Sequence, residues 1–328
     1  MKLIRKSYTL AVVFTAVVTV MLFSLNANAT EDIQLKPIKV SEHVYYFHGA
    51  AGVASSANQG FMSNAGFVVT DDGVVVYDAL ATPVLGQAMI TAIRSITKQP
   101  IKKVIVGHYH ADHIYGLQAF KKIGAEIVGH ENGKLYLSSD VAKQRLEQRK
   151  AELFPWVDDK TVVVAADKWL SFKDKKPIAF ELGGIRFQII DSSGAHSSED
   201  ILLFVENDKA LFAGDIYFSG RIPFVGNADS RTWLQTLDHL LDVKPVVVIP
   251  GHGSASTNTI KDIQMTKTYL LYLREKMGAA VQDLQGFEEA YRQTDWSQFE
   301  KQPAFEQANR LNAFGTYILM EHESLEKH

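Results

Sequence analysis

The segment that most constrains this chain is a short run of imidazole and carboxylate residues behind a buried strand. It reads His108-Tyr109-His110-Ala111-Asp112-His113 and follows an apolar, β-branched stretch at residues 101–106. That stretch is typical of a buried strand, and Gly107 ends it, so we expect the motif to lie on the loop at the strand's end. In α/β folds such strand ends are where sites are assembled. The fold must therefore gather several titratable side chains at one edge of a sheet.

Three further strand ends carry the same kinds of side chain. His196 follows an expected strand at residues 185–190, Asp215 ends an expected hairpin strand, and His252 follows an expected strand at residues 245–249. Neutral imidazole and carboxylate are ligands that divalent metals accept. Together with the motif they give seven candidate ligands. That is more than one four-coordinate ion binds, and it suits two ions that share a bridging ligand. The candidate metal ligands are His108, His110, Asp112, His113, His196, Asp215 and His252.

Such a pair of ions predicts hydrolytic chemistry. Two divalent ions about 3.5–4 Å apart can share a water and lower its pKa towards roughly 7. The resulting bridging hydroxide would attack an acyl carbon and open a C–N, C–O or C–S bond. We expect Asp112 and Asp215 to be the catalytic carboxylates, which orient the nucleophile and move protons. No serine or cysteine nucleophile is required.

The remaining pattern predicts an α/β fold of two similar halves. The first half has a hairpin at residues 66–70 and 74–77, a helix at 83–96, a strand at 101–106, a helix at 114–123 and a strand at 125–128. A charged helix is expected at 139–153 and a strand at 161–172. The second half repeats the order, with a hairpin at 201–206 and 210–213, a helix at 232–241 and a strand at 245–249. Residues from about 257 to 328 are expected to form a helical extension.

The first residues predict export rather than part of the fold. Lys2, Arg5 and Lys6 precede an apolar run at residues 8–23, and Ala27-Asn28-Ala29 is a small-x-small cleavage pattern. This layout is typical of a secretory signal peptide over residues 1–29, cleaved after Ala29, which leaves residues 30–328 as the mature domain. We therefore expect a periplasmic or secreted protein without stable membrane association after cleavage.

Composition excludes several classes of function. The sequence contains no cysteine, so disulfides, thiolate ligands and a cysteine nucleophile are excluded. Loss of the three positive charges of the signal peptide would take the formal charge from −3 to −6. A surface of that charge repels phosphate backbones, so we expect a small-molecule substrate and no nucleic acid.

The order of these ligands resembles the metallo-β-lactamase superfamily over about residues 44–253. The resemblance implies an αββα sandwich, in which two mixed β-sheets pack face to face with helices outside. It implies a first zinc held by His108, His110 and His196. It implies a second zinc held by Asp112, His113 and His252, with Asp215 as the bridge. Asp78 matches the family's aspartate at the end of an early strand, which supports the metal site from behind its ligands.

Three branches of that superfamily remain open. The third β-lactamase subclass has the same His-x-His-x-Asp-His motif without cysteine, and export favours a β-lactam substrate, but that subclass does not normally have a bridging aspartate such as Asp215. Thioester or lactone hydrolases similar to glyoxalase II match all the ligands. Their exported relatives, associated with sulfur oxidation and quinoprotein dehydrogenases, have stretches similar to residues 63–69 and 309–312. A mono-iron persulfide dioxygenase is the third branch, so iron or manganese is an alternative to zinc.

Outside these branches, a binding protein with a structural metal site is the other class. A structural site would normally close four ligands around one ion, which does not suit seven ligands on open strand ends. The sequence does not show which substrate the protein binds. We expect it to be set by loops near residues 49–63, 131–167 and 220–231. Candidate pocket residues are Tyr109, Tyr217 and Arg221, the last as a cation for a substrate carboxylate.

Overall fold

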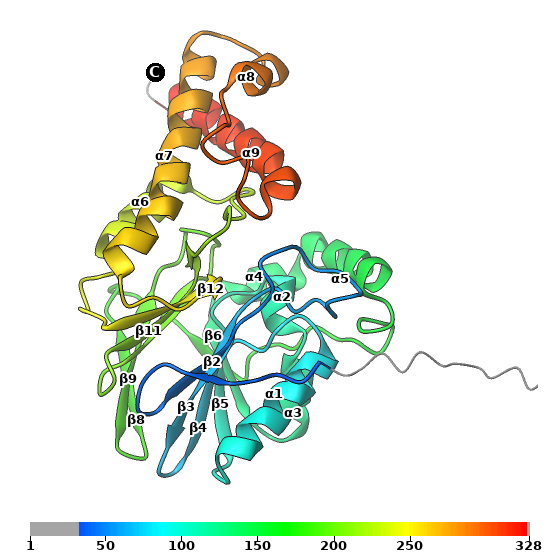
Figure 1. Cartoon of the computed structure of the whole chain (residues 1–328), viewed down its shortest axis with the longest axis vertical. Coiled ribbons are helices and arrows are strands. Elements are labelled where there is room, and N and C mark those ends of the chain that lie inside the picture. The colour runs from blue at the N-terminus through cyan, green and yellow to red at the C-terminus, as the bar shows by residue number, and fades with distance from the viewer. Residues whose placement is uncertain (1–32, 327–328) are drawn as a thin grey trace, which may run out of the picture. The chain divides into compact units, whose positions relative to one another are not determined.

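The computed structural model describes residues 33–326, in which two β-sheets pack face to face (Figure 1). The first sheet has the strand order β1-β2-β3-β4-β5-β6-β7, and the second has the order β12-β11-β10-β9-β8. Pairing in the first sheet is antiparallel up to β4 and parallel from β4 to β7. In the second sheet only β11 and β12 pair in parallel. Both sheets are therefore mixed, and the predicted αββα fold class is confirmed.

The elements of the fold have the following bounds. The strands of the first sheet are β1 Ile38–Lys39, β2 Val44–Phe47, β3 Ala65–Thr70, β4 Gly73–Tyr77, β5 Ile101–Ile105, β6 Glu126–His130 and β7 Lys168–Leu170. Those of the second are β8 Ile178–Leu182, β9 Ile185–Asp191, β10 Ile201–Val205, β11 Ala210–Phe218 and β12 Val247–His252. The helices are α1 Pro83–Ile96, α2 Ala111–Ile114, α3 Leu117–Lys122, α4 Gly133–Ser138, α5 Asp140–Leu153, α6 Ser230–His239, α7 Thr259–Gln282, α8 Phe287–Gln293 and α9 Phe305–Leu325.

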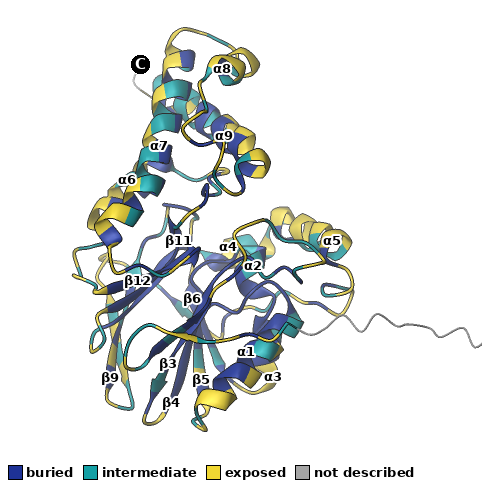
Figure 2. Ribbon diagram, in the orientation of Figure 1, coloured by how far each residue is buried: buried dark blue, intermediate teal, exposed yellow. Residues whose placement is uncertain are grey.

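Alternation of side chains along the strands builds three apolar layers. Inward-facing residues such as Val75 and Ile105 of the first sheet meet Phe187 and Phe212 of the second, and they form the central layer. The outer face of the first sheet packs under α1 and α3, and the outer face of the second packs under α6 and α7. Figure 2 shows the strands buried between helices whose outer faces are exposed. Removal of this apolar area from water is the main driving force for the fold.

Local signals set several element boundaries as predicted. The Thr82 side chain caps α1 by accepting a hydrogen bond from the Leu85 backbone N–H, and Pro83 starts the helix at the residue where it was expected to begin. Ser139 caps α5 in the same way through the Ala142 N–H. The β3–β4 hairpin turns at residues 71–72, between the two strands expected at residues 66–70 and 74–77.

Three sequence-based expectations are wrong. The helix expected at residues 114–123 is split into α2 and α3, and α2 begins inside the histidine motif. The strand expected at residues 161–172 shrinks to β7, because residues 161–166 run irregularly and the Val162 N–H bonds the Gln118 side chain instead of a strand. Strand β8 was not expected. The predicted signal peptide lies outside the described residues, and among the described helices none is long and apolar enough to span a membrane.

Candidate metal centre

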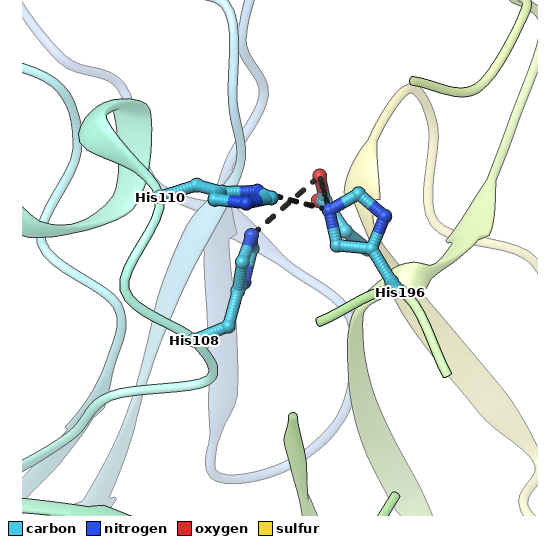
Figure 3. Close-up of side chains that lie close together, drawn as sticks. His108, His110 and His196 are labelled. Carbon is cyan, nitrogen blue, oxygen red and sulfur yellow. Dashed lines mark hydrogen bonds and ion pairs between the residues drawn. The ribbon is translucent and has the colours of Figure 1, made fainter. Parts of the chain in front are cut away.

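The imidazoles and carboxylates of the motif meet at the ends of strands from both sheets. His108 and His110 follow β5, and His110 is the residue before α2, which carries Asp112 and His113. From the second sheet, His196 lies between β9 and β10, and His252 is the last residue of β12. In Figure 3 the rings of His108, His110 and His196 point towards one common point. The predicted juxtaposition of these strand ends is thus present in the fold.

The site divides into two groups of potential ligands. The first contains His108, His110, His196 and Asp215, and the second contains Asp112, His113 and His252. Within each group the potential ligand atoms lie within 4.8 Å of one another. Each group can therefore hold one metal ion without a change of fold.

Asp215 belongs to the first group, but its carboxylate also reaches the second. Its Oδ2 is 3.4 Å from His196 Nε2 and 3.8 Å from His108 Nε2 in the first group. In the second group, Oδ1 is 3.3 Å from His113 Nε2, and Oδ2 is 3.4 Å from His252 Nε2. Asp215 was expected at the end of a strand, but β11 continues past it to Phe218 with irregular register on either side of Gly214. Gly251 of the neighbouring strand makes room for it, because a Cβ there would lie 1.9 Å from Asp215 Oδ1.

The chemistry of the cluster fits divalent metal ions. His108 Nε2, His113 Nε2, His252 Nε2 and Asp215 Oδ1 are buried, and none has a hydrogen-bond partner within residues 33–326. Buried polar atoms are nearly always satisfied, and unsatisfied ones are costly. Each of the three imidazole nitrogens has an Asp215 carboxylate oxygen at 3.3–3.8 Å, without the geometry of a hydrogen bond. A cation in each group would satisfy all four atoms.

Asp78 holds the second group from behind. Its Oδ2 lies 2.8 Å from His113 Nδ1, and its Oδ1 accepts a hydrogen bond of 2.7 Å from the Gly107 N–H. Asp78 follows β4 with a positive φ of 60°, an uncommon conformation that turns its carboxylate towards the motif. If Nδ1 donates to Asp78, His113 keeps its Nε2 lone pair for the cluster. This is the position that the family resemblance implied for Asp78.

Mutual electrostatics set the charge of the cluster. Burial disfavours the charged form of Asp215, but His252 and His113 outweigh it and lower the pKa of that carboxyl well below its usual value. The same opposition, with His113 as the main partner, lowers the pKa of Asp112. Burial and the neighbouring His113 lower the pKa of His108. Asp112 outweighs burial and raises the pKa of His113, and Asp215 does the same for His252. The cluster therefore combines ionised carboxylates with imidazoles, a donor set that divalent metals bind with release of protons.

Residues 62–64 support the same group and were not predicted as site residues. The Met62 carbonyl lies 2.9 Å from His252 Nδ1, and Ser63 Oγ donates a hydrogen bond of 2.5 Å to the Asp112 carbonyl. Asn64 Nδ2 donates to the carbonyls of Pro250 and Gly253, on either side of His252, at 2.8 and 2.7 Å. The sequence did contain a signal for this support: Ser63 and Asn64 stand directly before a strand expected to be buried. Buried polar side chains need hydrogen-bond partners, so such a pair indicates a contact with another part of the chain.

We expect Asn64→Ala to loosen the second group. The substitution removes two buried hydrogen bonds to the loop that carries His252, which should lower the free energy of unfolding by about 1–3 kcal/mol. Supporting contacts of this kind are typically worth roughly 10–100-fold in metal affinity. Metal titration and chemical denaturation measure both effects. Asn207→Ala is the matched control, because it also removes two side-chain hydrogen bonds, but at an exposed hairpin turn, and it should leave the metal affinity unchanged. Unchanged metal affinity in Asn64→Ala would contradict the supporting role.

The candidate pocket residues lie in different places. Tyr109 packs against Trp169, with ring centroids 5.8 Å apart, and beside Gly133 in the outer layer of the first sheet. Tyr217 is buried in the outer layer of the second sheet, where burial raises its pKa to about 12. Neither ring lies in the cluster. Tyr109 points to the opposite side of the chain from its neighbours His108 and His110, and Tyr217 points into the outer layer of the second sheet. Arg221 alone lies beside the cluster, with Nη1 3.3 Å from His252 Nδ1.

Comparison with known proteins identifies the class. Residues 58–252, more than half of the chain, match the family model described as the metallo-β-lactamase superfamily. The chain belongs to this superfamily, and it is a hydrolase with histidine and aspartate groups that bind divalent metal. It is 25% identical over 267 residues to the metallo-beta-lactamase type 2 of Elizabethkingia meningoseptica, a match that covers 79% of this chain and 94% of that protein. It is 20% identical to a linear primary-alkylsulfatase of Pseudomonas sp., where the match covers 62% of this chain and 44% of the relative.

Solved structures share the fold. A metallo-beta-lactamase from Pontibacter korlensis superposes with a TM-score of 0.58 and 20% identity, covering 73% of this chain and 99% of that one. An inverting sec-alkylsulfatase from Pseudomonas sp. superposes with a TM-score of 0.67 and 14% identity, covering 86% of this chain and 50% of that one. These two relatives are named for different substrates. The shared fold therefore leaves the substrate of this chain to its own pocket.

Proposed function

We propose that this chain is an exported binuclear zinc hydrolase that opens an acyl C–N, C–O or C–S bond of a small molecule. The first ion would be held by His108, His110 and His196, and the second by Asp112, His113 and His252. Asp215 would contact both ions. The observation that carries the proposal is the place of the Asp215 carboxylate, whose oxygens lie 3.3–3.8 Å from imidazole nitrogens of both groups.

Zinc ions at these positions supply Lewis-acid activation of a water and of the scissile carbonyl. The protein's own residues set the geometry for that chemistry. Asp78 and the Met62 carbonyl fix the rings of His113 and His252 through their Nδ1 atoms, so that both Nε2 atoms face the cluster. Asp112 has the most exposed carboxylate of the cluster, with 13% of its side chain accessible against 4% for Asp215. We assign to the Asp112 carboxylate, through the oxygen that is not a metal ligand, the acceptance of the proton from the attacking water and its transfer towards the leaving group.

A β-lactam is the leading substrate candidate. The relatives in Elizabethkingia meningoseptica and Pontibacter korlensis are named metallo-beta-lactamases, and the absence of cysteine suits the third subclass. A second candidate is a thioester or lactone, as in hydrolases similar to glyoxalase II. The position of Asp215 between the two groups favours this second candidate, because a bridging aspartate is a feature of that branch.

A panel of purified-protein assays tests the proposal. We expect hydrolysis of at least one of a chromogenic cephalosporin, a carbapenem, a lactone, a glutathione thioester and an alkyl sulfate, with zinc measured in the same preparation. Removal of metal by a chelator should abolish the activity, and zinc should restore it, because the cluster has no other source of an activated nucleophile. Iron together with oxygen consumption on a persulfide would instead identify a dioxygenase. Bound metal without turnover of any substrate would identify a binding protein.

A further inference from the structure

The outer ring nitrogen of one candidate metal ligand lacks a hydrogen-bond acceptor. His196 Nε2 faces the cluster, 3.0 Å from His110 Nδ1 and 3.4 Å from Asp215 Oδ2 (Figure 3). The other ring nitrogen of His196, Nδ1, is buried and has no hydrogen-bond partner among the residues that the structure describes. A histidine that binds a metal through Nε2 carries a proton on Nδ1 and almost always donates it to a carboxylate, a carbonyl or a water. His196 departs from this usual arrangement.

The histidines of the second group do have such acceptors. Asp78 Oδ2 lies 2.8 Å from His113 Nδ1, and the Met62 carbonyl oxygen lies 2.9 Å from His252 Nδ1. An outer acceptor fixes the orientation of the ring and raises the basicity of the nitrogen that binds the metal. The two groups of ligands are therefore supported unequally from outside the cluster.

The indole of Trp233 packs on the His196 ring from outside the cluster. The two ring centroids lie 5.0 Å apart, and the ring planes meet at 73°, which is a favourable edge-to-face arrangement. Trp233 is fully buried in α6. A Cβ on Gly194, in the same loop as His196, would lie 3.8 Å from Thr232 Cγ2, so the start of α6 packs along this loop. The ring of His196 is thus held by packing rather than by an acceptor at Nδ1.

The indole itself is fixed in place by a hydrogen bond. Trp233 Nε1 donates to the Ile216 carbonyl of β11 at 2.8 Å, and the Trp233 backbone N–H donates to the Asp229 carbonyl at 2.9 Å within the first turn of α6. With its only polar side-chain atom bonded and its surface fully buried, the indole has one available orientation. It is therefore a rigid support for the His196 ring.

Charge also distinguishes the two groups. Asp112 is a carboxylate of the second group alone, and Asp215 reaches His113 and His252 of that group at 3.3 and 3.4 Å. The first group contains three imidazoles and has only Asp215, which it shares. A divalent ion in the second group therefore meets more negative charge, and attraction between opposite charges is strong where water is excluded.

We propose that Trp233 positions His196 as a metal ligand by ring packing in place of a hydrogen bond, and that the first group therefore holds its ion more weakly than the second. The inference rests on the proposed two-metal function. The second group would fill first as zinc becomes available, and the first group would be the first to lose its ion. Because the proposed reaction uses both ions, the first group would then set the zinc concentration that the enzyme needs.

Calorimetric titration of the metal-free natural chain with zinc tests the order of binding. We expect two steps whose dissociation constants differ by roughly 10–100-fold, the usual effect of outer partners on metal affinity. His196→Ala should remove the weaker step, and His252→Ala should remove the tighter one. Two equal steps, or loss of the tighter step in His196→Ala, would overturn the inference while the metal centre stands. A natural chain that binds no zinc would overturn the metal centre and the inference together.

The role of Trp233 is tested by the same titration. Trp233→Leu should raise the dissociation constant of the weaker step by roughly 5–10-fold, since an aromatic pair contributes up to about 1.5 kcal/mol, or about tenfold. It should change the tighter step by less than about twofold, as independent sites do. Trp233→Phe keeps a ring but loses the bond to the Ile216 carbonyl, so its effect should be smaller, and it serves if the leucine variant does not fold.

Trp296→Ala is the matched control for these variants. Trp296 Nε1 also donates to a backbone carbonyl, that of Tyr291, but it lies in the C-terminal helices. Its replacement should leave both zinc steps unchanged. General damage to the fold would weaken both steps together, so an equal loss in both steps of Trp233→Leu would overturn the positioning role. A weaker step that is unchanged in both Trp233 variants would overturn it as well.

Discussion

Asp215→Ala should abolish hydrolysis, with a loss of at least about a thousandfold in kcat/KM, or about 4 kcal/mol of transition-state stabilisation. The physical reason is the position of this carboxylate, which contacts imidazoles of both ligand groups. Its loss leaves four buried imidazole nitrogens without their common anion and, in the proposed two-metal centre, removes the ligand shared by both ions. Steady-state kinetics on whichever substrate the panel identifies, together with metal analysis, measures the effect.

Asp208→Ala is the matched control for that substitution. Asp208 lies in the turn between β10 and β11, and 1% of its side chain is accessible. It accepts hydrogen bonds from Ser41 and from the His43 backbone, far along the strand from the cluster. Its replacement should lower stability but leave kcat/KM and metal content within about twofold per folded molecule. An Asp215→Ala variant that keeps full activity would contradict the bridging role.

Gly116→Ala should cause a large loss of stability next to the site. A Cβ at Gly116 would lie 1.8 Å from the Ala79 carbonyl oxygen and 3.0 Å from Gly86 Cα of α1. These atoms belong to backbone, so the overlap cannot be relieved by a rotamer change. We expect a loss of about 3 kcal/mol or more, at the upper end for overpacked cores, and a fall in Tm of roughly 5–10 °C.

The same substitution should weaken metal binding, because Gly116 packs on the segment that presents Asp78. The Gly116 N–H donates to the Leu80 carbonyl, and the Ala79 N–H donates to the His113 carbonyl. Displacement of residues 78–80 therefore moves the carboxylate that orients His113. Gly286→Ala, where a Cβ would meet nothing within 4 Å, should change stability by less than about 0.5 kcal/mol. Equal stability of the two variants would contradict this account of the packing.

The sequence predicted most of the fold because its signals were local and agreed with one another. Helix α1 has the predicted bounds, since a capping threonine, a proline and helical spacing all coincide. Residues 161–166 were expected to form a strand because they are rich in β-branched residues, which favour strands. In the structure β6 pairs only with residues 168–170, so residues 161–166 have no strand partner. Strand β8 was missed because it is a short edge strand whose side chains are only partly buried.

The ligand set was predictable because strand ends of an α/β fold converge, whereas the supporting contacts were not. The contact between Asn64 and the loop of His252 joins residues 186 and 189 positions apart in the chain, so no local pattern reveals it. Arg221 was named from the sequence as a cation near the pocket, but its contact with His252 is visible only in three dimensions. Tyr109 was expected in the pocket because it stands between His108 and His110 in the sequence, but its side chain points to the opposite side and packs on Trp169.

The metal content per chain, measured by mass spectrometry of the purified protein after zinc loading and dialysis, shows whether the two ligand groups each bind an ion. We expect about two zinc ions per natural chain. We expect about one in His252→Ala, which loses a ligand of the second group only, and about one in His196→Ala, which loses a ligand of the first. A natural chain that binds no zinc, or that keeps two ions in both variants, would contradict a two-metal centre built from these residues.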